Sequence, residues 1–242
     1  MCDTVIKIFH TFVIEILNYQ IMKRFICYFA FFCAISFFSS CSSSDSDEEL
    51  TETEEEVDPL DATGTINGYD YVDLGLSVKW ARCNLGASSI GDSGDFYSWG
   101  ETETKDYYST STYSAIVMDE ISGDETYDAA RANMGGKWRM PTSAEMSELI
   151  SSCDWEWTIE DHTNGYLVTG SNGNAIFLPA AGHYWTDSWL SVKEKGSYFT
   201  STRYVSDYSD TWAYFLYFDE DNKRLDSMGS MYYGYTIRAV CD

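Results

Sequence analysis

The side chains that most often carry chemistry in proteins are few and scattered in this 242-residue chain. Cys83, Cys153 and Cys241 stand in three separate contexts, so no close pair of thiols is available to hold a soft metal. A zinc site at His162 or His183 would need further ligands at suitable spacing. The sequence contains no glycine-rich phosphate loop and no G-x-S-x-G nucleophile turn. We therefore predict a protein that is not an enzyme and that carries neither a cofactor nor a transition metal.

Calcium is the one metal for which oxygen ligands occur close together, because hard cations prefer carboxylate and carbonyl oxygens. Asp92 with Asp95 forms one such group, and Asp219 with Asp221 and Asn222 forms another. Short acidic segments of this kind are also typical of solvated turns. We interpret both groups as turns and predict no metal site.

The C-terminal third of the chain has the composition of a recognition surface. Residues 203–212 read Arg-Tyr-Val-Ser-Asp-Tyr-Ser-Asp-Thr-Trp, and residues 226–235 add further Ser and Tyr. Tyr supplies rigid amphipathic area and Ser supplies adaptable hydrogen bonds, and an aromatic face can pack on the apolar face of a sugar. The candidate ligand-binding residues are Trp185, Trp189, Tyr204, Tyr208, Trp212, Tyr232 and Tyr233. The alternative is that all of these rings belong to the core.

The first elements that would position these residues are a strand and two helices. Residues 69–85 are predicted to be extended, because apolar and polar residues alternate near the centre of the segment. Residues 127–134 are typical of a short helix ended by two glycines. A second helix follows, because Thr142 and Glu145 have the spacing of a capping box. The apolar period of this helix places Cys153 on its buried face.

The later elements are predicted to be strands. Residues 165–169 and 175–178 flank Asn172-Gly173, which is the strongest short signal for a hairpin. Further strands are predicted at residues 198–202, 212–218 and 235–240. The second of these is apolar on both faces and is expected to be central in its sheet. One strand, two helices and then several strands indicate an α+β fold with mostly antiparallel sheet.

The beginning of the chain is typical of an export signal. A basic segment at residues 22–24 precedes an apolar run at residues 25–38, which is too short to span a bilayer. Phe38-Ser39-Ser40-Cys41 resembles the lipobox of bacterial lipoproteins, in which the cysteine is lipidated and becomes the new N-terminus. We predict a signal peptide and lipobox over residues 1–41, with Met22 as the true start. The alternative for residues 1–21 is an additional membrane-inserted segment.

Negative charge dominates the remainder. Residues 42–64 are predicted to be a flexible acidic spacer, because nine acids and no base lie between residues 42 and 60. The cluster is also similar to the surface-export signal of Bacteroidetes lipoproteins. Of the 39 acids and 15 bases of the chain, 28 acids and 12 bases lie in residues 61–242, which are therefore about 16 units negative. Such a domain is not expected to bind nucleic acid, since phosphate affinity comes mostly from Lys and Arg.

Three cysteines follow the spacer, and outside the cytoplasm they allow at most one disulfide within the chain. We predict that Cys83 pairs with Cys153. Pairing with Cys241 is the second possibility, and three buried free thiols are the third.

Six segments, in a fixed order, form a wider pattern. They are residues 71–81 (Tyr-Val-Asp-Leu-Gly-Leu-Ser-Val-Lys-Trp-Ala), 99–101 (Trp-Gly-Glu), 128–130 (Asp-Ala-Ala), 136–142 (Gly-Lys-Trp-Arg-Met-Pro-Thr), 172–182 (Asn-Gly-Asn-Ala-Ile-Phe-Leu-Pro-Ala-Ala-Gly) and 237–240 (Ile-Arg-Ala-Val). Together they resemble the Fibrobacter succinogenes major paralogous domain, which is common in Bacteroidetes lipoproteins. The resemblance implies a C-type-lectin-like fold over residues 65–242 and leaves the biochemical activity undefined. Ala239 departs from the proline usual in that family.

These observations predict a non-catalytic lipoprotein, held in the outer membrane by lipid on Cys41 and exposed at the cell surface. Its domain would bind a glycan or a surface protein. The alternative is a structural or assembly component of the bacterial envelope.

Overall fold

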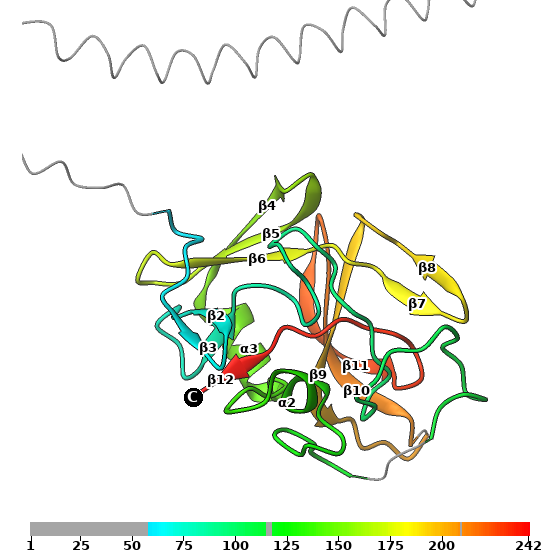
Figure 1. Cartoon of the computed structure of the whole chain (residues 1–242). Coiled ribbons are helices and arrows are strands. Elements are labelled where there is room, and N and C mark those ends of the chain that lie inside the picture. The colour runs from blue at the N-terminus through cyan, green and yellow to red at the C-terminus, as the bar shows by residue number, and fades with distance from the viewer. Residues whose placement is uncertain (1–57, 115–117, 209) are drawn as a thin grey trace, which may run out of the picture. The chain divides into compact units, whose positions relative to one another are not determined.

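The computed structural model describes residues 58–114, 118–208 and 210–242 (Figure 1). The predicted signal peptide and lipobox, including Cys41, and most of the predicted acidic spacer lie outside these residues. Within them the fold is α+β, with mostly antiparallel sheet and two short helices, which confirms the predicted class. No helix of this described part is long and apolar enough to cross a bilayer.

The two ends of the described chain meet in one four-stranded sheet, ordered β1-β2-β3-β12. Its strands are β1 (Gly64–Ile66), β2 (Tyr69–Val72), β3 (Lys79–Ala81) and β12 (Val240–Cys241). The strand predicted over residues 69–85 is therefore two strands, and the chain turns between them where Gly75 adopts a φ of 75°. The strand predicted at residues 235–240 is confirmed only at Val240, because β12 covers Val240–Cys241 and pairs with β3 over these two residues.

The predicted spacer is shorter than expected, because its last residues pack against the domain. The carbonyl of Pro59 accepts a hydrogen bond from the Ala175 N–H at 2.7 Å. The carbonyl of Leu60 accepts one from Arg82 Nε at 2.9 Å. These bonds fix the chain before β1 begins.

Both predicted helices are present, although the first begins at Ala129, two residues later than predicted. Helix α2 (Ala129–Met134) begins at Asp128, whose carboxylate accepts from the Arg131 N–H, and ends at Gly135. Helix α3 (Ser143–Ser152) begins with the predicted capping box, in which Thr142 and Glu145 satisfy each other's backbone N–H groups. The predicted helices are confirmed because their start and stop signals are local.

The capping box gives a first testable prediction. Thr142→Ala removes the hydroxyl that accepts from the Glu145 N–H, so the free energy of unfolding should fall by about 1 kcal/mol. Urea unfolding followed by circular dichroism measures the change. Ser147→Ala in the exposed middle of α3 is the matched control and should change stability by less than about 0.5 kcal/mol. Equal effects of the two substitutions would show that the cap contributes nothing.

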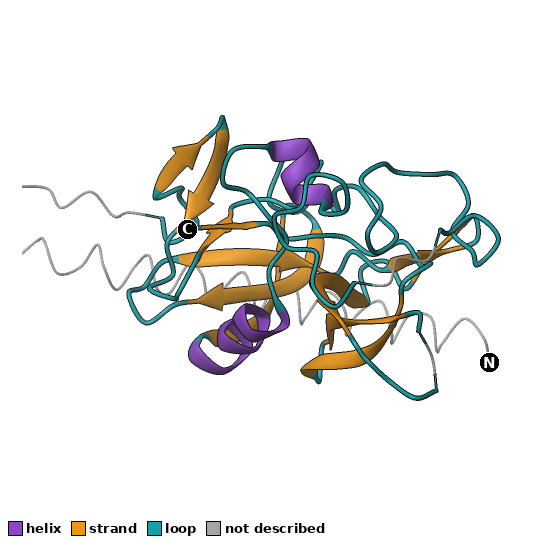
Figure 2. Cartoon of the chain, turned by 90° about the horizontal axis from the view of Figure 1, so that it is seen from below, coloured by secondary structure: helices purple, strands orange, loops and turns teal. Residues whose placement is uncertain are grey.

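Two three-stranded antiparallel sheets supply most of the remaining strands (Figure 2). The first contains β4 (Asp154–Glu160), β5 (Thr163–Thr169) and β6 (Ala175–Pro179), and its β5–β6 hairpin confirms the Asn-Gly prediction. The second is ordered β11-β10-β9 and contains β9 (Lys195–Arg203), β10 (Trp212–Asp219) and β11 (Lys223–Ser230). The predicted central position of residues 212–218 is therefore confirmed. Strands β4 and β11 were not predicted.

The β9–β10 pair separates two hydrophobic clusters. One cluster contains Phe199 and Phe215 together with Trp99, and the other contains Tyr198 and Leu216. Successive residues of a strand point to opposite faces, so each cluster covers one face of this pair. Burial on both faces explains why the β10 sequence is apolar almost throughout.

The three cysteines of the described residues are free thiols, so the predicted disulfide between Cys83 and Cys153 is wrong in this structure. Cys83 follows β3, whereas Cys153 ends α3 and packs on the second cluster. Cys241 is buried in β12. Burial raises the pKa of all three thiols, that of Cys153 to about 11. Thiols of this kind are protonated and poorly nucleophilic at neutral pH.

Candidate ligand-binding site

Two of the candidate tryptophans lie on a small hairpin at the edge of the domain (Figure 1). It consists of β7 (His183–Trp185) and β8 (Ser188–Leu190), with Tyr184 opposite Trp189 and Trp185 opposite Ser188. Because side chains alternate along a strand, Tyr184 and Trp189 share one face of the hairpin. Trp185 and His183 lie on the other face.

The backbone of the hairpin is held along β7 and at the turn. Tyr108 and Thr186 exchange two hydrogen bonds of 2.8 Å, and Tyr184 and Gly234 exchange two of 2.8 and 2.9 Å. Thr186 at the turn has a φ of 58°, an uncommon conformation for a β-branched residue. Such strain persists only where the surroundings enforce it, and it gathers at functional sites. The clamped turn therefore presents its side chains in a fixed arrangement.

An aromatic wall covers one face of the hairpin. The Tyr184 and Trp189 rings stack with centroids 6.1 Å apart, and Phe96 meets both edge-on at 5.0 and 5.9 Å. Tyr108 lies against Tyr184 at 5.6 Å. The indole N–H of Trp189 donates to the Ala181 carbonyl at 2.7 Å, yet 44% of the residue remains exposed. The wall is thus rigid and partly open to solvent.

The wall borders a pocket of about 500 Å³, which we call the hairpin pocket. Asp95, Asp106 and Asp187 line it and are exposed. Lys105 also lines it, but its ammonium group is paired with Glu101 and donates to the Thr112 carbonyl at 3.0 Å. The pocket therefore combines an aromatic surface with carboxylates that can accept hydrogen bonds.

The opposite face of the hairpin carries a second group of rings. His183 stacks on Tyr233 at 5.7 Å, and Trp185 lies tilted against Tyr233 at 6.2 Å. Tyr232 meets Tyr233 edge-on at 5.2 Å. Burial lowers the pKa of His183, with Lys195 adding to the effect, so the imidazole is held neutral. Three predicted residues, Trp185, Tyr232 and Tyr233, are brought together here, and Trp185 is 49% exposed.

The remaining candidates do not join either group in the ring contacts of the described residues. Tyr204 and Trp212 stack on each other at 6.3 Å beside the ends of β9 and β10, and both are half-buried. Tyr208 is 92% exposed in the loop between these strands. The seven candidate residues therefore lie in three separate places, since composition does not tell which face of an element a residue occupies.

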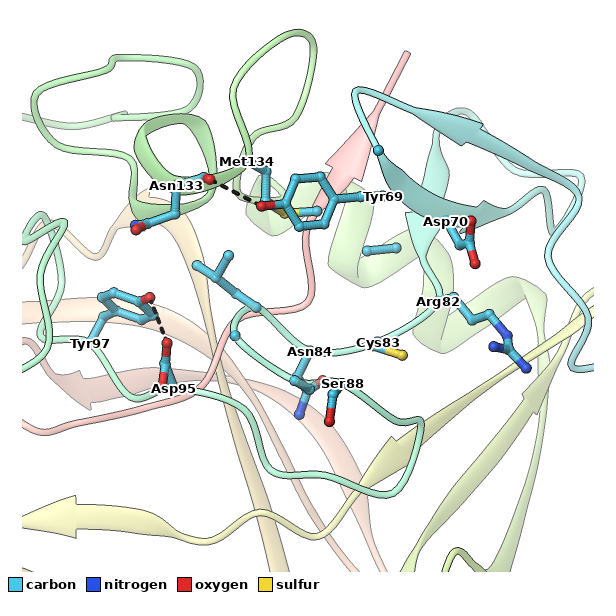
Figure 3. A pocket seen from close by; sticks show the side chains of 15 residues that line it. Tyr69, Asp70, Arg82, Cys83, Asn84, Ser88, Asp95, Tyr97, Asn133 and Met134 are labelled. Atoms are coloured by element: carbon cyan, nitrogen blue, oxygen red, sulfur yellow. Dashed lines mark hydrogen bonds between the residues drawn. The ribbon is translucent and has the colours of Figure 1, made fainter.

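A second pocket of about 510 Å³ adjoins the first, and we call it the loop pocket (Figure 3). Tyr69, Asp70 and Arg82 lie at one end of it, and Asp95 and Tyr97 lie at the other. The hydroxyl of Tyr97 donates to Asp95 at 3.4 Å. Burial, followed by the nearby Asp95, raises the pKa of Tyr97, so the phenol stays neutral. Asp95 lines both pockets.

Sequence reasoning missed most residues of the hairpin pocket. Phe96 and the acids Asp95 and Asp106 lie in a Gly-, Ser- and Asp-rich loop, far from the Tyr-rich segments that directed attention to the C-terminal third. The available signal was the presence of aromatic residues in so polar a loop. Tyr184 had a signal too, because it directly precedes the candidate Trp185.

Among the described residues, no group of three or more His, Cys, Asp or Glu side chains is arranged to hold a metal ion. The two acidic groups that were weighed for calcium form local hydrogen bonds. Asp92 accepts from Ser88 and Ser89, and Asp219 accepts from the backbone of Asp221 and Asn222. Asp92 and Asp219 therefore have the geometry of turn residues.

Comparisons with protein-family models, with curated proteins and with solved structures found no match to this chain. The resemblance to the Fibrobacter succinogenes major paralogous domain therefore stays a prediction, and the function is inferred from the site.

Proposed function

We propose that this chain is a non-catalytic carbohydrate-binding lipoprotein of the bacterial surface, with a C-type-lectin-like domain that binds glycans in the hairpin pocket. Lipid on Cys41 would tether it to the outer membrane. The proposal depends most on one observation. Trp189 is a large apolar side chain that is fixed in place, lines an acidic pocket and remains nearly half exposed.

The chemistry of the hairpin pocket suits a sugar. One face of a pyranose ring presents C–H groups that can pack on an indole, and its edges present hydroxyls. Asp95, Asp106 and Asp187 offer exposed carboxylate oxygens that can accept from those hydroxyls. Ligand sites commonly combine an apolar wall with a few polar groups in a pocket of roughly 300–1,000 Å³.

A fixed site lowers the entropic cost of binding. The hydrogen bonds from Tyr108 and Gly234 hold the hairpin backbone, and Ala181 holds the Trp189 indole. A platform that is already ordered gives up little conformational freedom when it receives a ligand. The same rings packed as interior core would be covered, whereas Trp185 and Trp189 are both about half exposed.

The position of the hairpin also agrees with a tethered binding domain. The first described residues lie against β6, since the Pro59 carbonyl accepts from the Ala175 N–H, and the β7–β8 hairpin lies at the far side of the domain (Figure 1). The point at which a tether would join the domain is therefore distant from the aromatic face. The acidic segment before it would hold the domain away from anionic lipid by charge repulsion.

A glycan array followed by titration calorimetry tests the proposal. The purified protein should bind one class of uncharged glycan, and Trp189→Ala should weaken that binding by about tenfold or more, since aromatic anchors dominate binding energy. Tyr208→Ala is the control, because Tyr208 is exposed but lies outside the pocket. An array without binding would refute glycan recognition and favour a structural role in the envelope. Unchanged affinity in Trp189→Ala would refute the hairpin pocket as the binding site.

A further inference from the structure

We infer that the hairpin pocket and the loop pocket are two halves of one groove, which binds an extended, uncharged oligosaccharide along its chain. This inference rests on the proposed function and names the ligand more closely. The ligand would cross the groove at Asp95, with one sugar unit against Trp189 and another against Tyr69. A site for a chain end alone would need only the hairpin pocket.

Asp95 is the residue that the two pockets share. Residues 95–97, which we call the Asp95 segment, separate the two pockets, because Phe96 lines the hairpin pocket and Tyr97 lines the loop pocket. Phe96 and Tyr97 are buried, whereas Asp95 is exposed at the start of the segment. A ligand that occupies both pockets therefore passes a carboxylate that can accept hydrogen bonds from its hydroxyls.

The Asp95 segment is held close to the neighbouring backbone by hydrogen bonds. The Asp95 N–H donates to the Leu85 carbonyl at 2.8 Å, and the Tyr97 N–H donates to the Tyr235 carbonyl at 2.9 Å. A Cβ atom at Gly86 would lie 2.2 Å from the Asp95 carboxylate. A Cβ atom at Gly94 would lie 2.4 Å from the Leu85 carbonyl oxygen. Glycine at both positions thus allows the Asp95 segment to lie close against residues 84–86.

An exposed aromatic residue stands in each pocket. Trp189 is 44% exposed in the hairpin pocket, and Tyr69 is 41% exposed in the loop pocket. Tyr69 is also held in place, because its hydroxyl donates to the Asn133 carbonyl at 3.3 Å and its ring meets Trp138 edge-on at 6.4 Å. Figure 3 places Tyr69 across the loop pocket from Asp95. Two fixed rings, one on each side of the Asp95 segment, suit a ligand made of repeating units.

The charges along the groove favour an uncharged chain. Asp70, Asp95, Asp106 and Asp187 are all exposed there. Two bases line the groove. Lys105 is paired with Glu101, and Arg82 donates through Nε to the Leu60 carbonyl. Carboxylates in excess repel uronate or sulfate groups and accept from neutral hydroxyls.

A length series of the uncharged oligosaccharide that binds on the array tests the inference by titration calorimetry. Affinity should rise by about tenfold once the chain is long enough to reach Tyr69. Tyr69→Ala should remove that gain and leave the shortest binding oligosaccharide unaffected. Trp189→Ala should weaken binding at every length. Tyr107→Ala is the matched control, because Tyr107 is a tyrosine of similar exposure, 45%, outside both pockets, and it should change nothing.

The possible failures can be told apart. Affinity that does not depend on length, with Tyr69→Ala equal to Tyr107→Ala, overturns the groove and leaves the Trp189 site standing. Unchanged binding in Trp189→Ala overturns the proposed function as well. Tighter binding of a uronate oligosaccharide than of the uncharged one overturns the ligand class. Ser88→Trp places a large side chain at the exposed rim of the loop pocket. If Tyr69→Ala does not fold, Ser88→Trp should remove the length-dependent gain in affinity in its place.

Discussion

Arg238→Met should lower the free energy of unfolding by about 3–5 kcal/mol, because it leaves several buried oxygen atoms without a donor. The guanidinium group is fully buried and donates to four oxygens. These are Asn84 Oδ1 at 2.9 Å, the Ala81 carbonyl at 3.1 Å, the Arg82 carbonyl at 2.9 Å and the Phe177 carbonyl at 2.7 Å. Burial lowers the pKa of Arg238, which marks the cost of placing a cation here. The bonds nevertheless join the segment after β3 to strand β6.

Urea unfolding measures this loss, and two further variants show its origin. Arg238→Lys keeps the charge but has fewer donors in a different geometry, so its stability should lie between those of the methionine variant and the original protein. Arg82→Met is the matched control, because Arg82 is half-buried and donates through Nε to a single carbonyl, and it should cost less than about 1.5 kcal/mol. If Arg238→Met cost no more than Arg82→Met, apolar packing alone would hold these segments together.

The role of Arg238 illustrates what the sequence alone can show. The closing segment Ile237 to Val240 was recognisable as part of a pattern, but the pattern does not tell where its arginine points. The acceptors of that arginine lie between 61 and 157 residues away along the chain. Only the tertiary structure brings them together. A buried arginine with carbonyl acceptors leaves no local trace in the composition.

Features that depend on a few neighbouring residues were predicted well. The capping box of α3, the glycine that ends α2 and the Asn-Gly hairpin all follow from hydrogen bonds or backbone angles within a few positions. The central place of β10 followed from its apolar residues on both faces. In each case the physical cause lies inside the segment, so the sequence contains it.

The candidate site was predicted only in part because its geometry is long-range. Strands β7 and β8 have three residues each, and their turn at Thr186 lacks the glycine that usually marks a hairpin. The turn and the outer edge of β7 are held by Tyr108 and Gly234, from distant parts of the chain. Trp189 was a candidate from its residue type, whereas its acidic neighbours and the loop pocket follow from folding.

Asp128→Ala should lower the free energy of unfolding by about 3 kcal/mol, because one buried carboxylate satisfies three backbone donors. Its Oδ1 accepts from the Arg131 N–H at 3.0 Å, which begins α2. Its Oδ2 accepts from the Gly123 N–H at 2.7 Å and from the Met140 N–H at 2.9 Å. The side chain thus ties the loop before α2 to the segment that leads into α3, and urea unfolding measures its loss.

Asp128→Asn distinguishes the contribution of the hydrogen-bond acceptors of this side chain from the contribution of its negative charge. Burial raises the pKa of the Asp128 carboxyl above its ordinary value, although the N–H groups of Gly123, Arg131 and Met140 act in the opposite direction. The folded state therefore holds this proton more tightly than the unfolded state, and the stability from this group falls as pH rises through the folded pKa.

The asparagine keeps one acceptor oxygen and does not ionise, so it should cost less than alanine, about 1–2 kcal/mol. Its deficit relative to the original protein should shrink as pH rises above the ordinary aspartate range. Asp124→Ala, which removes one exposed acceptor for the Thr126 N–H, should cost less than about 1 kcal/mol. A loss in Asp128→Ala equal to that in Asp124→Ala would show that solvent replaces the carboxylate and that the two segments do not depend on it.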